Sequence, residues 1–180
     1  MIYPIVAYGD AVLKKVCAKI TMGKPGLQTL IDDMFETMDS ANGVGLAAPQ
    51  IDKSIRLFIV DTSLMEEEIT IKKAFINPVI EEEWGEEWAY EEGCLSIPKI
   101  RGEVLRYDKI CITYEDIDGN KFTEDYEGMP ARVIQHEYDH IEGILFTDHL
   151  SPFKKRRLKS KLAKISKGIV DVTYRMKFPS

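Results

Sequence analysis

His136, Glu137 and His140 are the residues of this 180-residue chain whose types and spacing best suit catalytic chemistry. They lie in a segment whose apolar residues repeat with helical spacing, and residues four apart on a helix share one face. Both imidazoles can therefore reach one metal ion. Glu137, about 60° around the helix from His140, can handle the protons of a metal-bound water. The alternative is a pair of surface histidines on an amphipathic helix.

The third metal ligand decides the class of enzyme, because a catalytic site of this kind has three protein ligands and one open position. A metzincin protease would have a histidine at position 146, where this chain has Phe146. A thermolysin-like protease needs a downstream glutamate, and none follows Glu142. Neither protease pattern is complete. A different metallopeptidase and a non-catalytic metal-binding module remain as alternatives, although a closed structural site would need a fourth ligand.

The candidates for the third ligand are Cys17, Cys94, Cys111 and His149. Cys17 and Cys111 lie in helical or strand-like patterns, which are typical of buried structural thiols. His149 falls on the far side of any continued helix. Cys94 lies in the segment EGCLSIP at 92–98, where glycine and proline interrupt the strand pattern. A bulge there can aim a thiolate and leave backbone N–H groups free, but spacing alone does not decide between a ligand and a structural thiol.

Length and composition set the general class of protein. At 180 residues the chain is predicted to be a single domain, 1–180. Hydrophobic residues make up 44% and charged residues 30%, ordinary values for a soluble protein. No apolar run is long enough for a transmembrane helix, the first residues lack a signal-peptide pattern, and three cysteines are too few for a disulfide framework. We therefore expect a cytoplasmic protein without a membrane partner.

Periodicity predicts the elements that position these residues. Helices are predicted over 25–40, from Pro130 to Gly143 around the metal motif, and over 151–167. Strands are predicted at 56–61, 73–80, 109–115 and 121–126, a polar-faced hairpin at 81–92, and an edge strand in the tail, 168–180. Several strands followed by two late helices indicate an α+β fold.

The net charge of −6 is unevenly distributed. Residues 1–150 carry 14 basic and 29 acidic side chains, whereas residues 151–180 carry 10 basic side chains and one acidic. The acidic body argues against a general nucleic-acid-binding protein. The basic helix, 151–167, has two interpretations: a solvated face that balances the acidic body, or a local contact with RNA.

Three separated segments resemble the signature motifs of one enzyme family, peptide deformylase. They are GVGLAAPQ at 43–50, EGCLSIP at 92–98 and QHEYDH at 135–140, in the family's order and with similar spacing. The resemblance extends from about Ile5 to about Lys164. Ile141 stands where the family usually has leucine, and the tail after Lys167 lies outside the resemblance.

The resemblance implies a hydrolase that removes the N-formyl group from the initiator formyl-methionine of newly made polypeptides and releases formate. Cys94, His136 and His140 would bind one divalent metal ion, natively Fe²⁺, with Zn²⁺, Ni²⁺ or Co²⁺ as substitutes. The implied fold has antiparallel β-sheets packed around a central helix that carries the metal motif, followed by a C-terminal helix. The partners would be N-formylmethionyl nascent peptides. The basic C-terminal helix could contact the ribosome, as it does in some relatives. The resemblance does not imply an oligomeric state.

The resemblance also implies roles for the residues around the metal. A metal-bound hydroxide would attack the formyl carbonyl, with Glu137 as the general base and then the general acid. Gln50 and the backbone N–H of Leu95 would stabilise the oxyanion that forms. Asp139, which faces away from the metal, is predicted to pair with Arg106.

Substrate recognition is expected to use mainly the peptide backbone. The substrate would pair as an added strand beside 44–46 and 90–92, which is a β-augmentation mode. An apolar pocket closed by the ring of His136 would select methionine. The residues expected to contact the substrate are Val44, Gly45, Tyr90, Arg101, Met129 and Val133.

Overall fold

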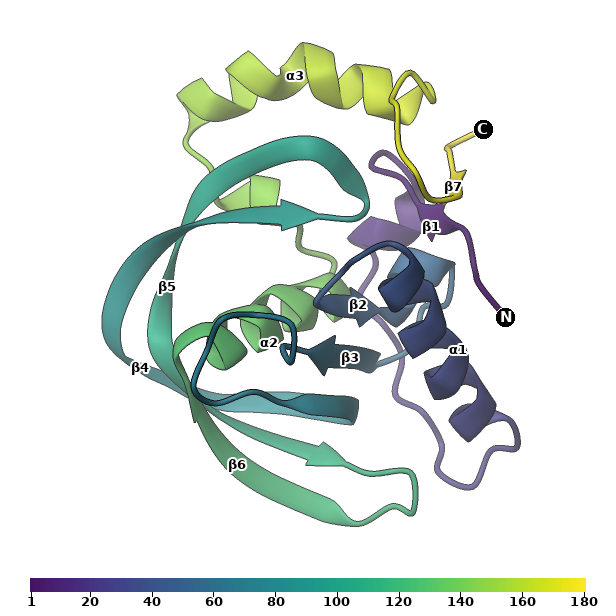
Figure 1. Cartoon of the computed structure of the whole chain (residues 1–180), viewed down its shortest axis with the longest axis vertical. Helices are drawn as coiled ribbons and strands as arrows, with labels where there is room; N and C mark the ends of the chain where they lie inside the picture. Colours follow the sequence, from purple (N-terminus) through teal and green to yellow (C-terminus); the bar gives the residue numbers. More distant parts are fainter.

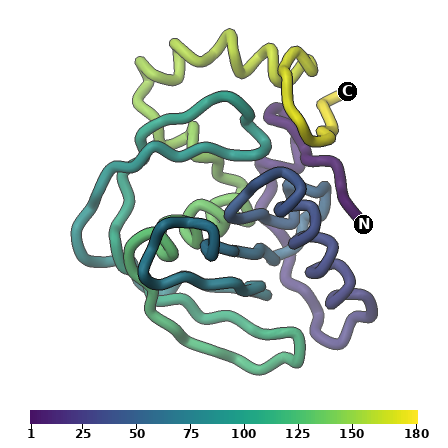
Figure 2. Tube along the Cα trace, viewed as in Figure 1, coloured from purple at the N-terminus to yellow at the C-terminus, as the bar shows by residue number.

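The chain folds as a curved antiparallel sheet that wraps around one central helix, as a computed structural model of residues 1–180 shows (Figure 1). The sheet has the strand order β2-β3-β4-β5-β6, and α2 lies within its curve (Figure 1). The Cα trace in Figure 2 shows the two longest strands bending together around this helix. A separate parallel pair, β1 and β7, joins segments from the two ends of the chain. The α+β fold with a central motif helix and a C-terminal helix is therefore confirmed.

The elements have the following bounds. The helices are α1 (Leu27–Ser40), α2 (Gly128–Ile141) and α3 (Pro152–Ser166), each with ends within two residues of the predicted ones. The strands are β1 (Ile5–Val6), β2 (Gly45–Ala47), β3 (Leu57–Asp61), β4 (Lys72–Cys94), β5 (Ile97–Glu115), β6 (Lys121–Glu127) and β7 (Met176–Lys177). Short 3₁₀ helices span Ala11–Lys14, Ala48–Ile51 and Phe146–His149. None of the helices has the length and apolar character needed to cross a bilayer.

Strand β3 separates two layers of the core. Leu57 and Ile59 pack among the residues of α1, whereas Phe58 and Val60 pack among those of α2. Since successive side chains of a strand point to opposite faces, a strand covered on both faces is apolar throughout, as β3 is. The sheet thus provides a rigid wall behind α2, which carries the metal motif.

Helix α2 is terminated by Gly143, a position whose backbone conformation requires glycine. The N–H of Ile144 donates to the carbonyl of Asp139 at 2.9 Å, and the N–H of Gly143 donates to that of His140 at 3.2 Å. This is a Schellman motif, in which the glycine adopts the left-handed conformation, here with φ of 75°. A Cβ on Gly143 would also lie 2.5 Å from the carbonyl oxygen of Lys14. The end of the helix, and hence the position of His140, is therefore fixed by local sequence.

The hairpin predicted within 81–92 is wrong. Strand β4 runs without a break from Lys72 to Cys94 and pairs with β5 along its length, so the hairpin turn comes only at Leu95 and Ser96. Gly85 lies at a bulge where the pairing shifts between Trp84 and Glu87. Its φ is 89°, and the next N–H donates to the side chain of Asp108. The bulge bends the strand without ending it.

The tail is only partly the edge strand that was predicted. Met176 and Lys177 pair with Ile5 and Val6, whereas residues 168–175 form no strand. The partner is the short strand β1 and not the edge of the five-stranded sheet. Apolar and polar residues alternate from Val170 to Met176, although most of this segment is irregular. The side chains of Val170 and Met176 pack against the core.

Candidate metal and active site

Cys94, His136 and His140 come together in the folded chain. Their potential ligand atoms all lie within 4.8 Å of one another, with Cys94 Sγ 3.4 Å from His140 Nε2. The two histidines occupy one face of α2, and their ring centroids are 5.0 Å apart. Burial lowers the pKa of His140 well below its ordinary value, and the charge of His136 adds to this effect. A neutral ring keeps a lone pair for a metal. One sulfur and two imidazole nitrogens suit a borderline ion such as Fe²⁺ or Zn²⁺.

The position of Cys94 depends on the end of the β4–β5 hairpin. The strand pairing shifts between Gly93 and Cys94, and Cys94 then pairs with Ile97 across the two-residue turn. This irregularity turns the thiol of the last strand residue toward α2 and His140. The hairpin therefore supplies the third donor to the pair on the helix.

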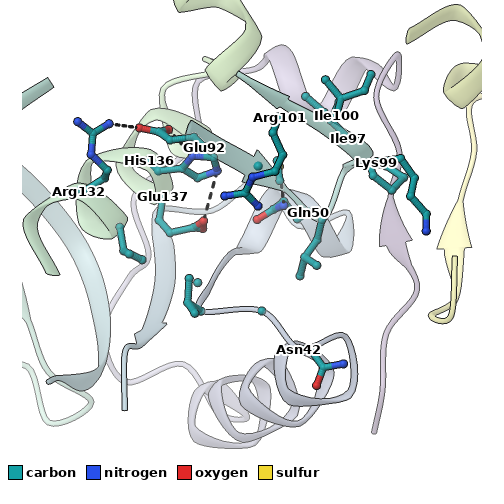
Figure 3. Close-up of a pocket in the computed structure, with 18 of the residues that line it drawn as sticks. Asn42, Gln50, Glu92, Ile97, Lys99, Ile100, Arg101, Arg132, His136 and Glu137 are labelled. Carbon is teal, nitrogen blue, oxygen red and sulfur yellow. Dashed lines mark hydrogen bonds and ion pairs between the residues drawn. The ribbon is translucent and has the colours of Figure 1, made fainter. Parts of the chain in front are cut away.

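Glu92 holds His136 in place from behind. This carboxylate is 4% exposed and lies 2.9 Å from His136 Nδ1, which leaves Nε2 for the donor cluster. Arg106 donates to the two carboxylate oxygens at 2.7 and 3.0 Å, and Arg132 also donates to it (Figure 3). Burial alone would raise the pKa of Glu92, but the bonds from His136 and Arg106 hold it well below the usual range. A carboxylate behind a metal-binding histidine fixes its ring orientation and strengthens the nitrogen as a donor.

Glu137 lies beside the donor cluster with one oxygen lacking a partner. Its side chain is 3% exposed, and Oε1 is 3.8 Å from His136 Nε2. Oε2 is buried and accepts no hydrogen bond. Burial raises the pKa of Glu137 to about 7, although the charge of His136 opposes the shift. Gly45 of β2 makes room for this group, because a Cβ there would lie 2.8–3.1 Å from Glu137 Cγ, Cδ and Oε1.

Gln50 and Leu95 provide two N–H groups near the cluster. Gln50 is 1% exposed on the 3₁₀ helix after β2, and its Oε1 accepts from the N–H of Ala47 at 3.0 Å. This bond orients Nε2 toward Ser96 Oγ at 3.1 Å and Cys94 Sγ at 3.4 Å. The N–H of Leu95 has no hydrogen-bond partner in the protein. The Leu95 N–H therefore has capacity for an oxygen in the cavity, whereas the two N–H groups of Gln50 Nε2 face Ser96 Oγ and Cys94 Sγ at its edge.

A cavity of about 640 Å³ opens onto the cluster. In Figure 3 the side chains of Gln50, Arg101, His136 and Glu137 turn toward a common space. The cavity is lined by Cys94, His136, Glu137, Gln50 and Leu95, and by the six residues expected to contact substrate, Val44, Gly45, Tyr90, Arg101, Met129 and Val133. His140 is 1% exposed and lies deeper. The guanidinium of Arg101 donates to the carbonyl of Glu91 at 2.7 Å.

The other candidate ligands lie away from the cluster. Cys17 and Cys111 are free thiols and are not among the residues that could hold a metal together. His149 Nε2 lies 2.8 Å from the carboxylate of Asp139, near the surface, and donates to it. Asp139 also accepts from Arg106 at 2.9 Å, so the predicted Asp139–Arg106 pair is confirmed.

Three features of the site are not evident from the sequence. Glu92 was seen only as part of a motif, and its role depends on partners from two other elements. The second is Arg132, whose guanidinium lies 4.4 Å from the ring centroid of Trp88 and donates to the carbonyl of that residue. The tail residues 172–174 also line the cavity. Arg132 lies one helical turn before His136, a spacing that places both on one face of the helix and could have pointed to a shared partner such as Glu92. No feature of the sequence places the tail at the cavity.

The chain is similar to known proteins along most of its length. The family model described as polypeptide deformylase matches residues 2–156. A peptide deformylase of Cytophaga hutchinsonii is 61% identical over 181 residues, which cover 99% of this chain and 98% of the relative. The structure of a plant peptide deformylase has a TM-score of 0.85 at 31% identity and covers 96% of each chain. An actinonin-bound class I type b peptide deformylase from Acinetobacter baumannii has a TM-score of 0.77 at 36% identity, covering 84% of this chain and 99% of that one.

Proposed function

Because the chain belongs to the peptide deformylase family of hydrolases, we propose that it removes the N-formyl group from the initiator formyl-methionine of newly made polypeptides with the help of one divalent metal ion. Cys94, His136 and His140 are the proposed ligands, and Glu137 is the proposed general base and acid. The native ion is proposed to be Fe²⁺, with Zn²⁺, Ni²⁺ and Co²⁺ as substitutes.

One observation carries the proposal: three metal donors and a buried carboxylate with a free oxygen surround one end of a cavity. A buried polar atom without a partner is costly unless a ligand or water satisfies it. The chain also provides only three donors, which is the number expected of a catalytic site with an open position. A non-catalytic module with a closed metal site would need a fourth.

Glu137 and Glu92 have different proposed roles in amide hydrolysis. A bound divalent ion acidifies a water ligand toward a pKa of ~7 and polarises a carbonyl. Glu137 Oε2 is free to accept a proton from the attacking water, and the same carboxyl can return it to the departing amine. Glu92 keeps the His136 ring oriented throughout, since Arg106 and Arg132 hold its own carboxylate.

Gln50 and Leu95 are proposed to stabilise the charge that forms on the formyl oxygen. The Gln50 amide is fixed before any substrate binds, because Ala47 and Ser96 hold it on two sides. The Leu95 N–H is free of competing bonds. Preorganised donors of this kind cost no rearrangement during the reaction, and losing one typically raises the barrier by roughly 3–4 kcal/mol.

The substrate backbone is proposed to pair with two free strand edges. Strand β2 is the edge of the sheet, since β3 is its only partner, and residues 90–92 of β4 pair with β5 on one side only. Residues from both segments line the cavity, so a peptide can add as a strand between them. Val44, Tyr90, Met129 and Val133 would form the methionine pocket, Gly45 would pair with the peptide backbone, and Arg101 would lie near its downstream part.

The basic face of α3 is proposed to contact the ribosome, from which the substrates emerge. All seven basic residues of this helix are exposed, and only Leu162 and Ile165 are buried. We propose that the protein works in the cytoplasm, where a reducing environment keeps the thiol of Cys94 available to the metal.

A Glu137→Gln variant tests the assignment of the base. Loaded with Co²⁺ under anaerobic conditions, the wild type should release formate from formyl-Met-Ala-Ser and leave the peptide bonds intact. Glu137→Gln should bind the same amount of metal but lose at least about 100-fold in kcat. The matched control is Glu103→Gln, which makes the same chemical change at an exposed position of β5 and should keep full activity.

Two results would contradict the proposal. Cleavage of the peptide bonds in either the formylated peptide or its unformylated analogue would indicate a peptidase instead. Unchanged formate release by Glu137→Gln would remove Glu137 from the mechanism. As a separate check, actinonin, which is bound in the Acinetobacter baumannii relative, should raise the Tm of the metal-loaded protein.

A further inference from the structure

The carbonyl of Leu95 is held by a residue of the C-terminal tail. The hydroxyl of Tyr174 donates to it at 2.8 Å across a separation of 79 residues. No backbone N–H donates to this carbonyl. The tail residues 172–174 also line the cavity, so Tyr174 lies at the site itself.

The two ends of the chain hold the two carbonyls of the same turn. Tyr174 binds the carbonyl of Leu95, and the N–H of Tyr8 donates to that of Ser96 at 2.8 Å. A two-residue turn has few bonds of its own, and the N–H of Leu95 is left without a partner. This free N–H shares its peptide plane with the carbonyl of Cys94, inside the hairpin, whereas the next plane, which carries the Leu95 carbonyl, is held from outside it.

The tail is anchored to β1 directly after Tyr174. Directly after Tyr174, the carbonyl of Arg175 accepts from the N–H of Ile5 at 2.9 Å, and the carbonyl of Lys177 accepts from the N–H of Ala7 at 2.8 Å. Figure 3 shows this segment of the tail beside the strand that carries Ile5, on the side of the pocket where Lys99 projects. The ring of Tyr174 also packs against the same apolar cluster as Leu95. The hydroxyl therefore has little freedom to move away from the turn.

We propose that Tyr174 is a positioning residue that aims the Leu95 N–H at the formyl oxygen. This inference rests on the proposed function, in which that N–H stabilises the oxyanion. The peptide plane after Leu95 turns about the Leu95 backbone, so holding its carbonyl restricts the backbone angles that also orient the N–H. A misplacement of about 1 Å in a positioned group can lower a rate by about 100-fold. One hydroxyl on the tail can thus act on the rate without touching the substrate.

A Tyr174→Phe variant tests the proposal, since it removes the hydroxyl and keeps the ring. The kcat for formyl-Met-Ala-Ser should fall about 3- to 10-fold, the effect of one neutral hydrogen bond on a donor of the transition state. The KM should change less than about twofold, because the hydroxyl does not contact substrate. The Leu95 amide should shift in the ¹H–¹⁵N NMR spectrum and exchange faster with solvent, whereas Tm should change little.

The matched control is Lys177→Met on the same tail. Lys177 pairs with Asp52, and both side chains are about half exposed, so its loss should leave kcat and the Leu95 amide signal unchanged. Wild-type kcat in Tyr174→Phe would overturn the proposal, and so would parallel losses of kcat and Tm in both variants. If the wild type releases no formate, the proposed function fails and the proposed role fails with it. The NMR shift would then report only that the hydroxyl contact exists.

Discussion

Gly45 lies so close to Glu137 that the site has no room for a side chain at position 45. A methyl group at position 45 would overlap the Glu137 carboxylate, the nearest atoms being only 2.8–3.1 Å away. Real Cβ atoms do not tolerate that distance, so one side chain must move. Since the strand backbone at Gly45 is paired with Val60, the carboxylate is the part that yields.

We predict that Gly45→Ala lowers kcat by about 100-fold or more, because a displaced Glu137 no longer reaches the attacking water. Metal content should stay the same, since no ligand moves. The control is Gly102→Ala, whose methyl would meet Leu150 Cδ2 at a similar 2.8 Å but lies away from Glu137. A steady-state assay with metal analysis distinguishes them; equal activities for the two variants would refute the crowding argument.

Residue chemistry was predictable where it depended on local spacing. His136 and His140 lie one helical turn apart, so the sequence alone placed them on one face. Cys94 needed the resemblance, because its distance from the helix is a property of the whole hairpin. Glu92 could not be assigned a role from its position, since that role comes from His136, Arg106 and Arg132 meeting around it. Contacts between residues that are distant in the sequence produce no periodic pattern from which they could be predicted.

Secondary structure was predictable for helices more than for long strands. The apolar period of α1 and α2 is repeated over several turns, so their type was clear. The sequence predicts a break in strand β4 because seven glutamates between residues 81 and 92 interrupt its apolar pattern. Six of these glutamates are exposed and only Glu92 is buried, so pairing with β5 and not apolar alternation maintains the strand. Sheet pairing therefore overrode local composition.

A polar cluster joins β4 and β6 away from the metal-donor residues. Lys73 of β4 donates to Glu124 of β6 at 3.1 Å and to Tyr126 at 3.0 Å. Burial opposes the charge on each group, but the hydrogen bonds prevail. They raise the pKa of Lys73 above its ordinary value of 10.5 and lower that of Glu124 below 4.5. Both shifts favour the charged pair in the folded state.

The pH dependence of stability follows from these directions. The contribution of Glu124 is complete above pH 4.5 and is lost as the pH falls through its lowered pKa; that of Lys73 is lost as the pH rises above 10.5. We predict that Lys73→Met lowers Tm by about 1–4 °C at pH 7, since the pair is partly exposed. The difference should shrink at strongly acidic pH. Lys72→Met, which removes a weaker 3.9 Å pair with Asp61, is the control; a pH-independent difference would refute the linkage.

At the scale of the whole molecule, charge is separated along the chain. The last 30 residues carry 10 basic side chains against one acidic, while the rest of the protein is strongly acidic. Such a separation leaves a positive face on a protein whose net charge is −6. A positive face of this kind binds phosphates through release of counterions, and that binding weakens steeply with salt.

We predict that the protein sediments with ribosomes at low salt and dissociates as the salt concentration rises. The double variant Lys154→Glu/Lys161→Glu should bind more weakly and with a shallower salt dependence. Lys19→Glu/Lys24→Glu makes the same charge change at exposed positions far along the sequence from α3 and should bind like the wild type. Equal weakening by both variants would indicate general electrostatic attraction and not a surface on α3.

The arrangement of the whole chain was only partly predictable. The α+β class followed from the order of the elements, and the central position of α2 followed from the family resemblance. The parallel pairing of β1 with β7 could not be read from either end, because each strand has only two residues. Such short segments carry no alternation of their own, so their pairing is decided by the surface that the rest of the fold offers.

The pairing of β1 with β7 joins the two ends of the chain, which leads to a prediction about the order of folding. β1 is the first element made and β7 is the last, so this closure spans nearly every other element of the fold. Contacts between residues this far apart in the sequence form slowly, because the loop between them must close first. The helices and the long hairpin can assemble earlier through nearer neighbours. We therefore predict that the contacts of Tyr8 and Tyr174 with the turn at Leu95 and Ser96 form late, so that refolding experiments recover compactness before turnover.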